Sequence, residues 1–200
     1  MQEPFSQDDR AALGWAWTTR SPTGRLLRAR RERGETAAPT EDDLAAVRRE
    51  WEAAGRPAPE RHVHRTDVEL PDGTQVTAVS FLGDDPYDRD AAPAFGLYLD
   101  ERWDPPWPHE HVAWPDFGVP GGDDVGPALQ RLLDRARAGD RVEIGCLGGH
   151  GRTGTALACL AVLAGTPGDA AVDWVRAHYC PDAVETDGQR AFVEGYGGSP

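Results

Sequence analysis

The chain has 200 residues and a formal net charge of −13 at pH 7. That length is sufficient for one domain with a hydrophobic core, and the acidic balance argues against nonspecific binding to nucleic acid. No stretch approaches the roughly 20 apolar residues of a membrane span, and the first residues lack a signal-peptide pattern, so we expect a cytoplasmic protein with no membrane association.

The basic residues and the cysteines narrow the class of protein further. All 21 basic residues are arginine, and Ala, Gly and Pro are abundant, a composition that we interpret as the product of a GC-rich bacterial genome. Three cysteines are few and odd in number, so no disulfide framework is implied. We expect Cys159 to lie in a hydrophobic core and Cys180 to lie at the end of a helix.

The first 35 residues show no clear periodic pattern and carry six arginines between Arg20 and Arg33. This cluster could dock an acidic partner, but a solvated segment balanced by the acidic remainder is the interpretation that we favour. The predicted organisation is therefore an arginine-rich N-terminal extension over residues 1–35, partly disordered, followed by a single domain over residues 36–200.

A helix is predicted from residue 40 to about residue 54, because Thr40 is a favourable N-cap and three acidic residues follow it. Strands are predicted next, at residues 66–70, 74–82, 95–99 and 111–113, the first two forming a hairpin. Later helices are predicted at residues 124–138, 170–178 and 187–196. Such alternation indicates an α/β fold with a central mixed sheet flanked by helices.

The segment from Val142 to Gly154 reads V-E-I-G-C-L-G-G-H-G-R-T-G, a short apolar strand, a glycine-rich loop and the start of an apolar helix. Amides in such a loop and the helix N-terminus attract an anion, and the same field stabilises the thiolate of Cys146. Arg152 offers a planar fork of donors for two phosphate oxygens, and Thr153 places a hydroxyl near the sulfur. A strand-loop-helix turn with a buried cysteine is the plainer alternative.

A second segment, from Trp114 to Pro120, reads W-P-D-F-G-V-P. Its two prolines and its glycine predict a loop, on which Asp116 could donate a proton to a leaving group. Taken alone, the segment fits a tight turn with a capping aspartate equally well.

Together, and in this order, the two segments resemble those of the cysteine-dependent protein-tyrosine and dual-specificity phosphatases. The resemblance implies their fold and a phosphocysteine formed on Cys146, with Arg152 binding the phosphoryl group and Asp116 acting first as acid and then as base. Thr153 would assist the thiolate. No metal or cofactor is used in this family. The phosphate-binding residues would be Leu147, Gly148, Gly149, His150, Gly151 and Arg152.

Gln189 is a further candidate that the resemblance suggests. In similar phosphatases a glutamine in this region positions the hydrolytic water. Thr186 fits as the N-cap of the helix that carries it. A surface glutamine without a role is the equal alternative.

Two residues depart from the family pattern. Gly145 stands where the family usually has a histidine that helps to hold the loop. His150 occupies a variable position of the loop, either as a basic contact for a substrate with extra negative charge or as a solvated residue without a role. The second interpretation is slightly favoured.

The expected substrate is a phosphorylated protein or a small phosphate ester. Residues 1–70 contain no tyrosine that could deepen the pocket as in strict phosphotyrosine enzymes, which favours dual specificity, with phosphotyrosine still accepted. The main alternative is a noncatalytic phosphate- or phosphopeptide-binding protein. Sulfur transfer or arsenate reduction is a weaker alternative, since those relatives lack the W-P-D loop. The oligomeric state is not specified by the sequence.

Overall fold

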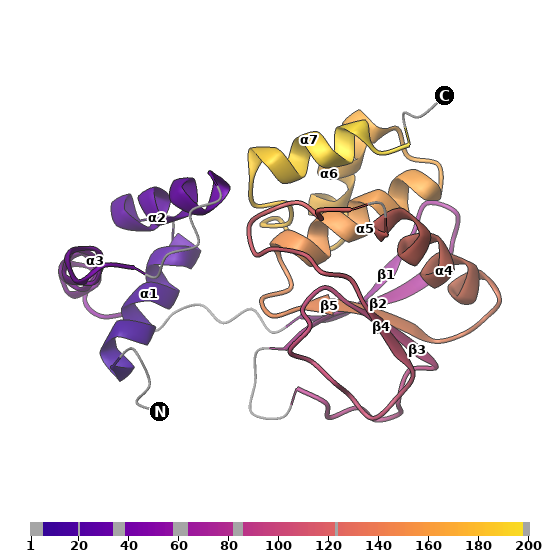
Figure 1. The fold of residues 1–200 in the computed structure, drawn as a ribbon, viewed down its shortest axis with the longest axis horizontal. Coiled ribbons are helices and arrows are strands. Elements are labelled where there is room, and N and C mark those ends of the chain that lie inside the picture. The colour runs from indigo at the N-terminus through magenta and orange to yellow at the C-terminus, as the bar shows by residue number, and fades with distance from the viewer. Residues whose placement is uncertain are drawn as a thin grey trace. The chain divides into compact units, whose positions relative to one another are not determined.

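A computed structural model describes residues 6–19, 21–33, 39–57, 64–81, 86–122 and 124–197, and within these ranges the fold is as follows (Figure 1). The chain divides into two compact units, residues 1–62 and residues 63–200. Each unit has hydrophobic residues of its own at its centre.

The first unit contains three helices, α1 (Gln7–Thr19), α2 (Pro22–Glu32) and α3 (Glu41–Ala53). α3 begins as predicted, because the Thr40 side chain accepts a hydrogen bond from the Asp43 amide while the Asp43 carboxylate accepts one from the Thr40 amide. The buried centre combines small and large apolar side chains from all three helices, namely Ala12, Ala16, Leu27, Val47 and Trp51.

This unit differs from the predicted N-terminal extension in two ways. Residues 7–32 are largely helical rather than irregular, and the boundary between the units lies at residue 62 rather than at residue 35. The physical reason is that α3 packs on α1 and α2 and is bonded to them through paired charges. Arg30 bonds the carboxylate of Asp43 over 2.7 Å, and Arg48 bonds that of Asp9, whose pKa it lowers to about 2.

The second unit is built on a five-stranded mixed sheet, as the sequence predicted. Its strands are β1 (Arg65–Glu69), β2 (Gln75–Ser80), β3 (Phe95–Tyr98), β4 (His109–His111) and β5 (Val142–Cys146). Their spatial order is β1-β2-β5-β3-β4, with β1 antiparallel to β2 and the other neighbours parallel. The predicted hairpin is confirmed, whereas the strand expected at residues 111–113 lies two residues earlier.

Two helices, α4 (Val125–Arg137) and α5 (Gly151–Leu163), pack against one face of this sheet (Figure 1). On the same side, α6 (Gly168–His178) and α7 (Asp187–Gly195) pack on α5. Their predicted positions are confirmed to within a few residues. α5 is apolar on all sides because it lies inside the main core, where Cys159 is fully buried as expected. None of the helices among the described residues is long and apolar enough to cross a membrane.

The opposite face of the sheet carries an aromatic cluster that buries Phe81, Tyr98 and Trp107 against one another. A buried polar network accompanies it. The Tyr98 hydroxyl donates to the Glu143 carboxylate over 2.5 Å and accepts from Trp107 Nε1 over 2.6 Å, and Arg89 bonds Glu143 over 2.9 Å. Burial, and then the charge of Glu143, raises the pKa of Tyr98, so that this hydroxyl remains a donor.

Candidate active site

The candidate site begins at Cys146, the last residue of the central strand β5. Its sulfur is buried and accepts two hydrogen bonds, from the Gly149 amide at 3.3 Å and from the Thr153 hydroxyl at 3.0 Å. Gly149 has a φ of +79°, a conformation that turns its amide back toward the strand end and that favours glycine. Two hydrogen-bond donors are thus aimed at this one sulfur.

Arg152 lies beside this loop, in the first turn of α5, and is only 5 % exposed. Its Nη1 donates to the carbonyl oxygens of Leu99 at 2.9 Å and Trp114 at 3.3 Å, which fixes the plane of the guanidinium. Its Nε is buried, and in the described part of the chain it has no hydrogen-bond partner. A buried donor without a partner is costly, so this edge of the guanidinium fits an anion.

Asp116 is held over the same guanidinium by an anchored loop. Trp114 is buried, and its indole nitrogen closes the loop by donating to the Gly118 carbonyl at 2.9 Å. The Asp116 carboxylate lies 3.3 Å from Arg152 Nη2, while its side chain stays 58 % exposed. The structure therefore brings Asp116 to Arg152, with the carboxylate on the solvent side, and Arg152 follows directly on the loop that begins at Cys146.

The likeness to known proteins agrees with this geometry. A family model described as "Swiss Army Knife protein, DSP-PTPase phosphatase domain" matches residues 103–192. Two uncharacterised proteins of Methanocaldococcus jannaschii are 36% and 35% identical over 110 residues, which is 50% of this chain and 74% and 68% of theirs. The chain belongs to the cysteine-dependent dual-specificity phosphatase superfamily.

Solved structures of phosphatases share the fold. Tk-PTP in its active form is 26% identical, with a TM-score of 0.52 over 64% of this chain and 95% of that one. Kinase associated phosphatase with its catalytic-site cysteine changed to serine is 14% identical, with a TM-score of 0.55 over 68% of this chain and 95% of that one. The second likeness concerns the fold alone.

Gln189, a candidate of the phosphatase pattern, is fully buried rather than a surface residue. Its side-chain oxygen accepts from the Glu185 amide at 2.8 Å, and its nitrogen donates to the Gly118 carbonyl at 3.3 Å. Thr186 caps its helix as predicted, by accepting from the Gln189 amide. Gln189 thus connects α7 with the loop that carries Asp116.

Packing explains why position 145 is a glycine, where the phosphatases usually have a histidine. Gly145 lies on the aromatic face of the sheet, where a Cβ would stand 2.5 Å from Val79 Cγ2 and 2.7 Å from the Val79 carbonyl oxygen. Phe81 lies 3.4 Å from the same point. The neighbouring strand therefore occupies the space in which a side chain at position 145 would begin.

Asp100 is a residue of the site that the sequence reasoning missed. Its buried carboxylate lies 3.3 Å from Arg152 Nη2 and accepts two hydrogen bonds from Arg102, at 2.8 and 2.6 Å. These hydrogen bonds from Arg102, with the charge of Arg152, hold the pKa of Asp100 below its usual range. A usable signal was present, because Asp100 follows β3 closely and parallel strands end at one edge of a sheet.

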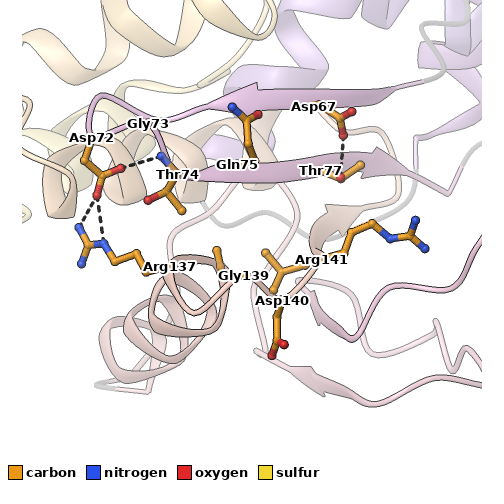
Figure 2. A pocket seen from close by; sticks show the side chains of 12 residues that line it. Asp67, Asp72, Gly73, Thr74, Gln75, Thr77, Arg137, Gly139, Asp140 and Arg141 are labelled. Carbon is orange, nitrogen blue, oxygen red and sulfur yellow. Dashed lines mark hydrogen bonds and ion pairs between the residues drawn. The ribbon is translucent and has the colours of Figure 1, made fainter.

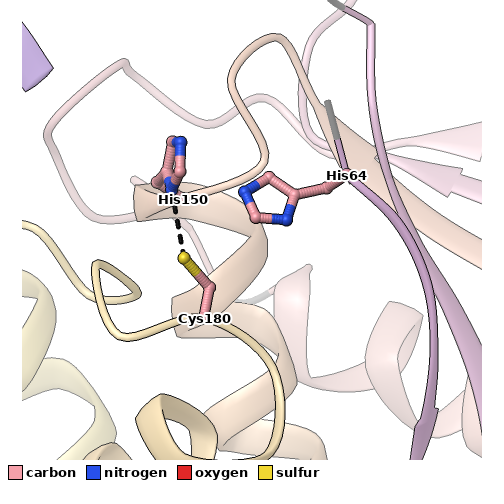
Figure 3. Close-up of side chains that lie close together, drawn as sticks. All are labelled: His64, His150 and Cys180. Atoms are coloured by element: carbon pink, nitrogen blue, oxygen red, sulfur yellow. Dashed lines mark hydrogen bonds between the residues drawn. The ribbon is translucent and has the colours of Figure 1, made fainter. Parts of the chain in front are cut away.

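His150 belongs to the phosphate loop but its ring turns toward Cys180, with Nδ1 3.4 Å from Sγ (Figure 3). The ring of His64 lies 4.6 Å from that of His150, centroid to centroid. Tyr179 adds a hydrogen bond to the Gly149 carbonyl at 2.7 Å. Neither His64 nor Tyr179 was singled out from the sequence, since only the fold brings them to the loop.

A separate pocket of about 600 Å³ lies where β5 begins, at the end of that strand far from Cys146 (Figure 2). The turn between β1 and β2 and the connection from α4 to β5 line it. Asp72 and Arg137 form a 2.6 Å ion pair at its rim. Its distance from the thiol separates it from the chemistry of the phosphate loop, and we assign it no part in that chemistry.

Proposed function

We propose that this protein is a phosphoprotein phosphatase that hydrolyses phosphate monoesters through a phosphocysteine intermediate. The observation that carries the proposal is the convergence on one anion site of three groups with separate chemical roles. They are a sulfur that accepts two hydrogen bonds, a buried arginine edge and an exposed carboxylate.

In the first step, the Cys146 thiolate attacks phosphorus, so that an S–P bond forms while the P–O ester bond breaks. Asp116 gives its proton to the departing oxygen, because an alkoxide or phenoxide is a poor leaving group. Arg152 and the loop amides between residues 147 and 152 bind the three other phosphoryl oxygens, whose charge they offset.

In the second step, water attacks phosphorus and the S–P bond breaks, which releases inorganic phosphate. Asp116, now a carboxylate, takes the proton of that water, and the Thr153 hydroxyl bonds the thiolate as it leaves. Gln189 acts in this step through the loop that it contacts, or on the water directly. No step uses a metal or a cofactor.

For the substrate, we propose a phosphorylated protein, with phosphotyrosine accepted and phosphoserine and phosphothreonine as further substrates. The exposed position of Asp116 supports this, because a proton donor on the solvent side leaves room for a protein-bound leaving group. The noncatalytic alternative has no need of a carboxylate at this place.

An aryl phosphate assay in the presence of a metal chelator tests the proposal. We expect vanadate-sensitive phosphate release by the wild type and none by Cys146→Ser. Asp116→Asn should lose about 10²- to 10⁴-fold in rate with poor leaving groups. Turnover that survives Cys146→Ser would refute the proposal, and phosphopeptide binding without any turnover would select the noncatalytic alternative.

A further inference from the structure

Three side chains from separate parts of the second unit converge beside the phosphate loop. His64 stands immediately before β1, His150 immediately before α5 and Cys180 two residues after α6. One nitrogen of each imidazole and the sulfur all lie within 4.8 Å of one another. Figure 3 shows the ring of His64 directed toward the pair that His150 and Cys180 form.

The separations between these three ligand atoms are close to those in a tetrahedral zinc site, and a small side-chain movement would make them equal. With Zn–S near 2.3 Å and Zn–N near 2.0–2.1 Å, a tetrahedron places S and N about 3.6 Å apart and two N atoms about 3.3 Å apart. The observed separation of His150 Nδ1 and Cys180 Sγ is 3.4 Å. The His64 ring would have to move by about 1 Å to complete the triangle, a shift within the reach of side-chain rotation.

The kind of ligand selects the kind of metal. Two imidazoles and a thiolate suit Zn²⁺, whereas Mg²⁺ and Ca²⁺ need oxygen ligands, and no carboxylate belongs to this cluster among the described residues. Cys180 is buried and His150 is partly exposed, so an ion could enter from the side of His150. We propose that His64, His150 and Cys180 bind one Zn²⁺ ion, with water as the fourth ligand.

Such an ion would be coupled to the phosphate loop without taking part in the proposed reaction. His150 is a residue of that loop, and its neighbour Gly149 donates to Cys146 Sγ and accepts from the Tyr179 hydroxyl. Bound zinc would therefore tie the loop to the segment before β1 and to the end of α6. The site is independent of the proposed phosphatase activity and can be tested without it.

The test uses the full chain with Cys146→Ser, because the candidate nucleophile could itself bind metal. We expect one equivalent of Co²⁺ to give tetrahedral d–d bands and a thiolate-to-cobalt charge-transfer band, and Zn²⁺ to displace it. Zinc should also raise Tm in a concentration-dependent way, because it binds the folded state. A further Cys180→Ser change should abolish the charge-transfer band.

Three more variants guard against misfolding and against chance binding. His64→Gln and His150→Gln should each weaken Co²⁺ binding at least tenfold while the metal-free far-UV spectrum stays unchanged. His178→Gln, which alters an exposed histidine outside the cluster, should bind as its parent does. A charge-transfer band that persists without Cys180, or no stoichiometric binding in the Cys146→Ser chain, would overturn the proposal and leave a thiol–imidazole hydrogen bond.

Discussion

The side-chain nitrogen of Gln189 donates to the carbonyl oxygen of Gly118 across 3.3 Å, and this bond joins the last helix to the loop of Asp116. Gln189→Met keeps the volume but removes this bond and the one from the part-buried Glu185 amide, at a cost of about 1–3 kcal/mol. We expect turnover to fall most for esters with poor leaving groups, because Asp116 loses its support.

Rates measured over a series of aryl phosphates check this prediction. Asp116→Asn is the reference variant, since its leaving-group dependence sets the upper limit. If Gln189→Met lowered the rate equally for every leaving group, Gln189 would act in the second step, in which water attacks, and not by supporting the loop that carries Asp116.

Gly145 should tolerate no side chain. Gly145→Ala would press a methyl group into Val79, and overpacking of this kind costs about 1–3 kcal/mol. Val79→Ala in the same chain removes the clash with Cγ2 but not that with the backbone oxygen, so recovery should be partial. Urea unfolding of the two single variants and the double variant measures this, and full additivity would contradict the packing explanation.

Asp100 should make stability depend on pH. Its folded-state pKa lies below the ordinary value of 3.8, so its carboxylate stabilises the fold above about pH 4, and this contribution is lost as the pH falls through the folded-state pKa. The difference in unfolding free energy between wild type and Asp100→Asn should therefore be largest near neutral pH and shrink below pH 4. Urea unfolding between pH 3 and pH 7 checks it. A difference that stays constant over this range would be contrary to expectation.

The buried network behind the sheet should matter for stability. Tyr98→Phe leaves Trp107 Nε1 without an acceptor and removes one donor from Glu143, so we expect a loss of about 2 kcal/mol or more. Tyr87→Phe is the matched control, because the Tyr87 hydroxyl accepts from the Asp104 amide at the surface and its loss should cost about 0.5 kcal/mol or less. Thermal or urea unfolding measures both variants. If Tyr98→Phe and Tyr87→Phe lost similar amounts of unfolding free energy, the explanation by burial would be wrong.

The division of the chain into two units predicts how truncations behave. A fragment over residues 63–200 contains the whole candidate site, so its kcat/KM for an aryl phosphate should stay within a few-fold of the full chain. Deletion of residues 1–35 alone should promote aggregation, because α3 would expose Val47 and Trp51. Size-exclusion chromatography and the phosphatase assay distinguish these outcomes. A folded but inactive 63–200 fragment would show that the first unit is needed for turnover.

The parts of the site that sequence could predict are those in which neighbours along the chain are neighbours in space. Cys146, Thr153 and Arg152 belong to one strand-loop-helix segment, so their spacing constrains their geometry directly. His64 and Cys180 reach the loop only through tertiary packing, which a single sequence does not reveal. For Asp100 the signal was its position just after β3, at the same edge of the sheet as Cys146. The reason for Gly145 lies in Val79, a residue of the neighbouring strand.

The first two helices of the first unit, α1 and α2, were missed for a related reason. Residues 20–33 are dominated by arginine, so their apolar pattern is weak, and α2 depends on charged partners in α3 such as Asp43 and Glu50. Thr23 bonds Glu50 over 2.6 Å, a contact between residues 27 positions apart. By contrast, the strong apolar patterns of α4 and β5 were sufficient to place these elements.

The strand that ends at Cys146 is the last of the five along the chain but the middle one in the sheet. In the described fold, the β1–β2 hairpin and the β3–β4 pair are bridged through β5. During synthesis the sheet therefore cannot close until residue 146 has left the ribosome, since domains fold as units while the chain emerges. The Cys146 thiol is thus shielded by its neighbours from the moment at which the sheet assembles, and a nascent chain that stops before β5 lacks this candidate nucleophile.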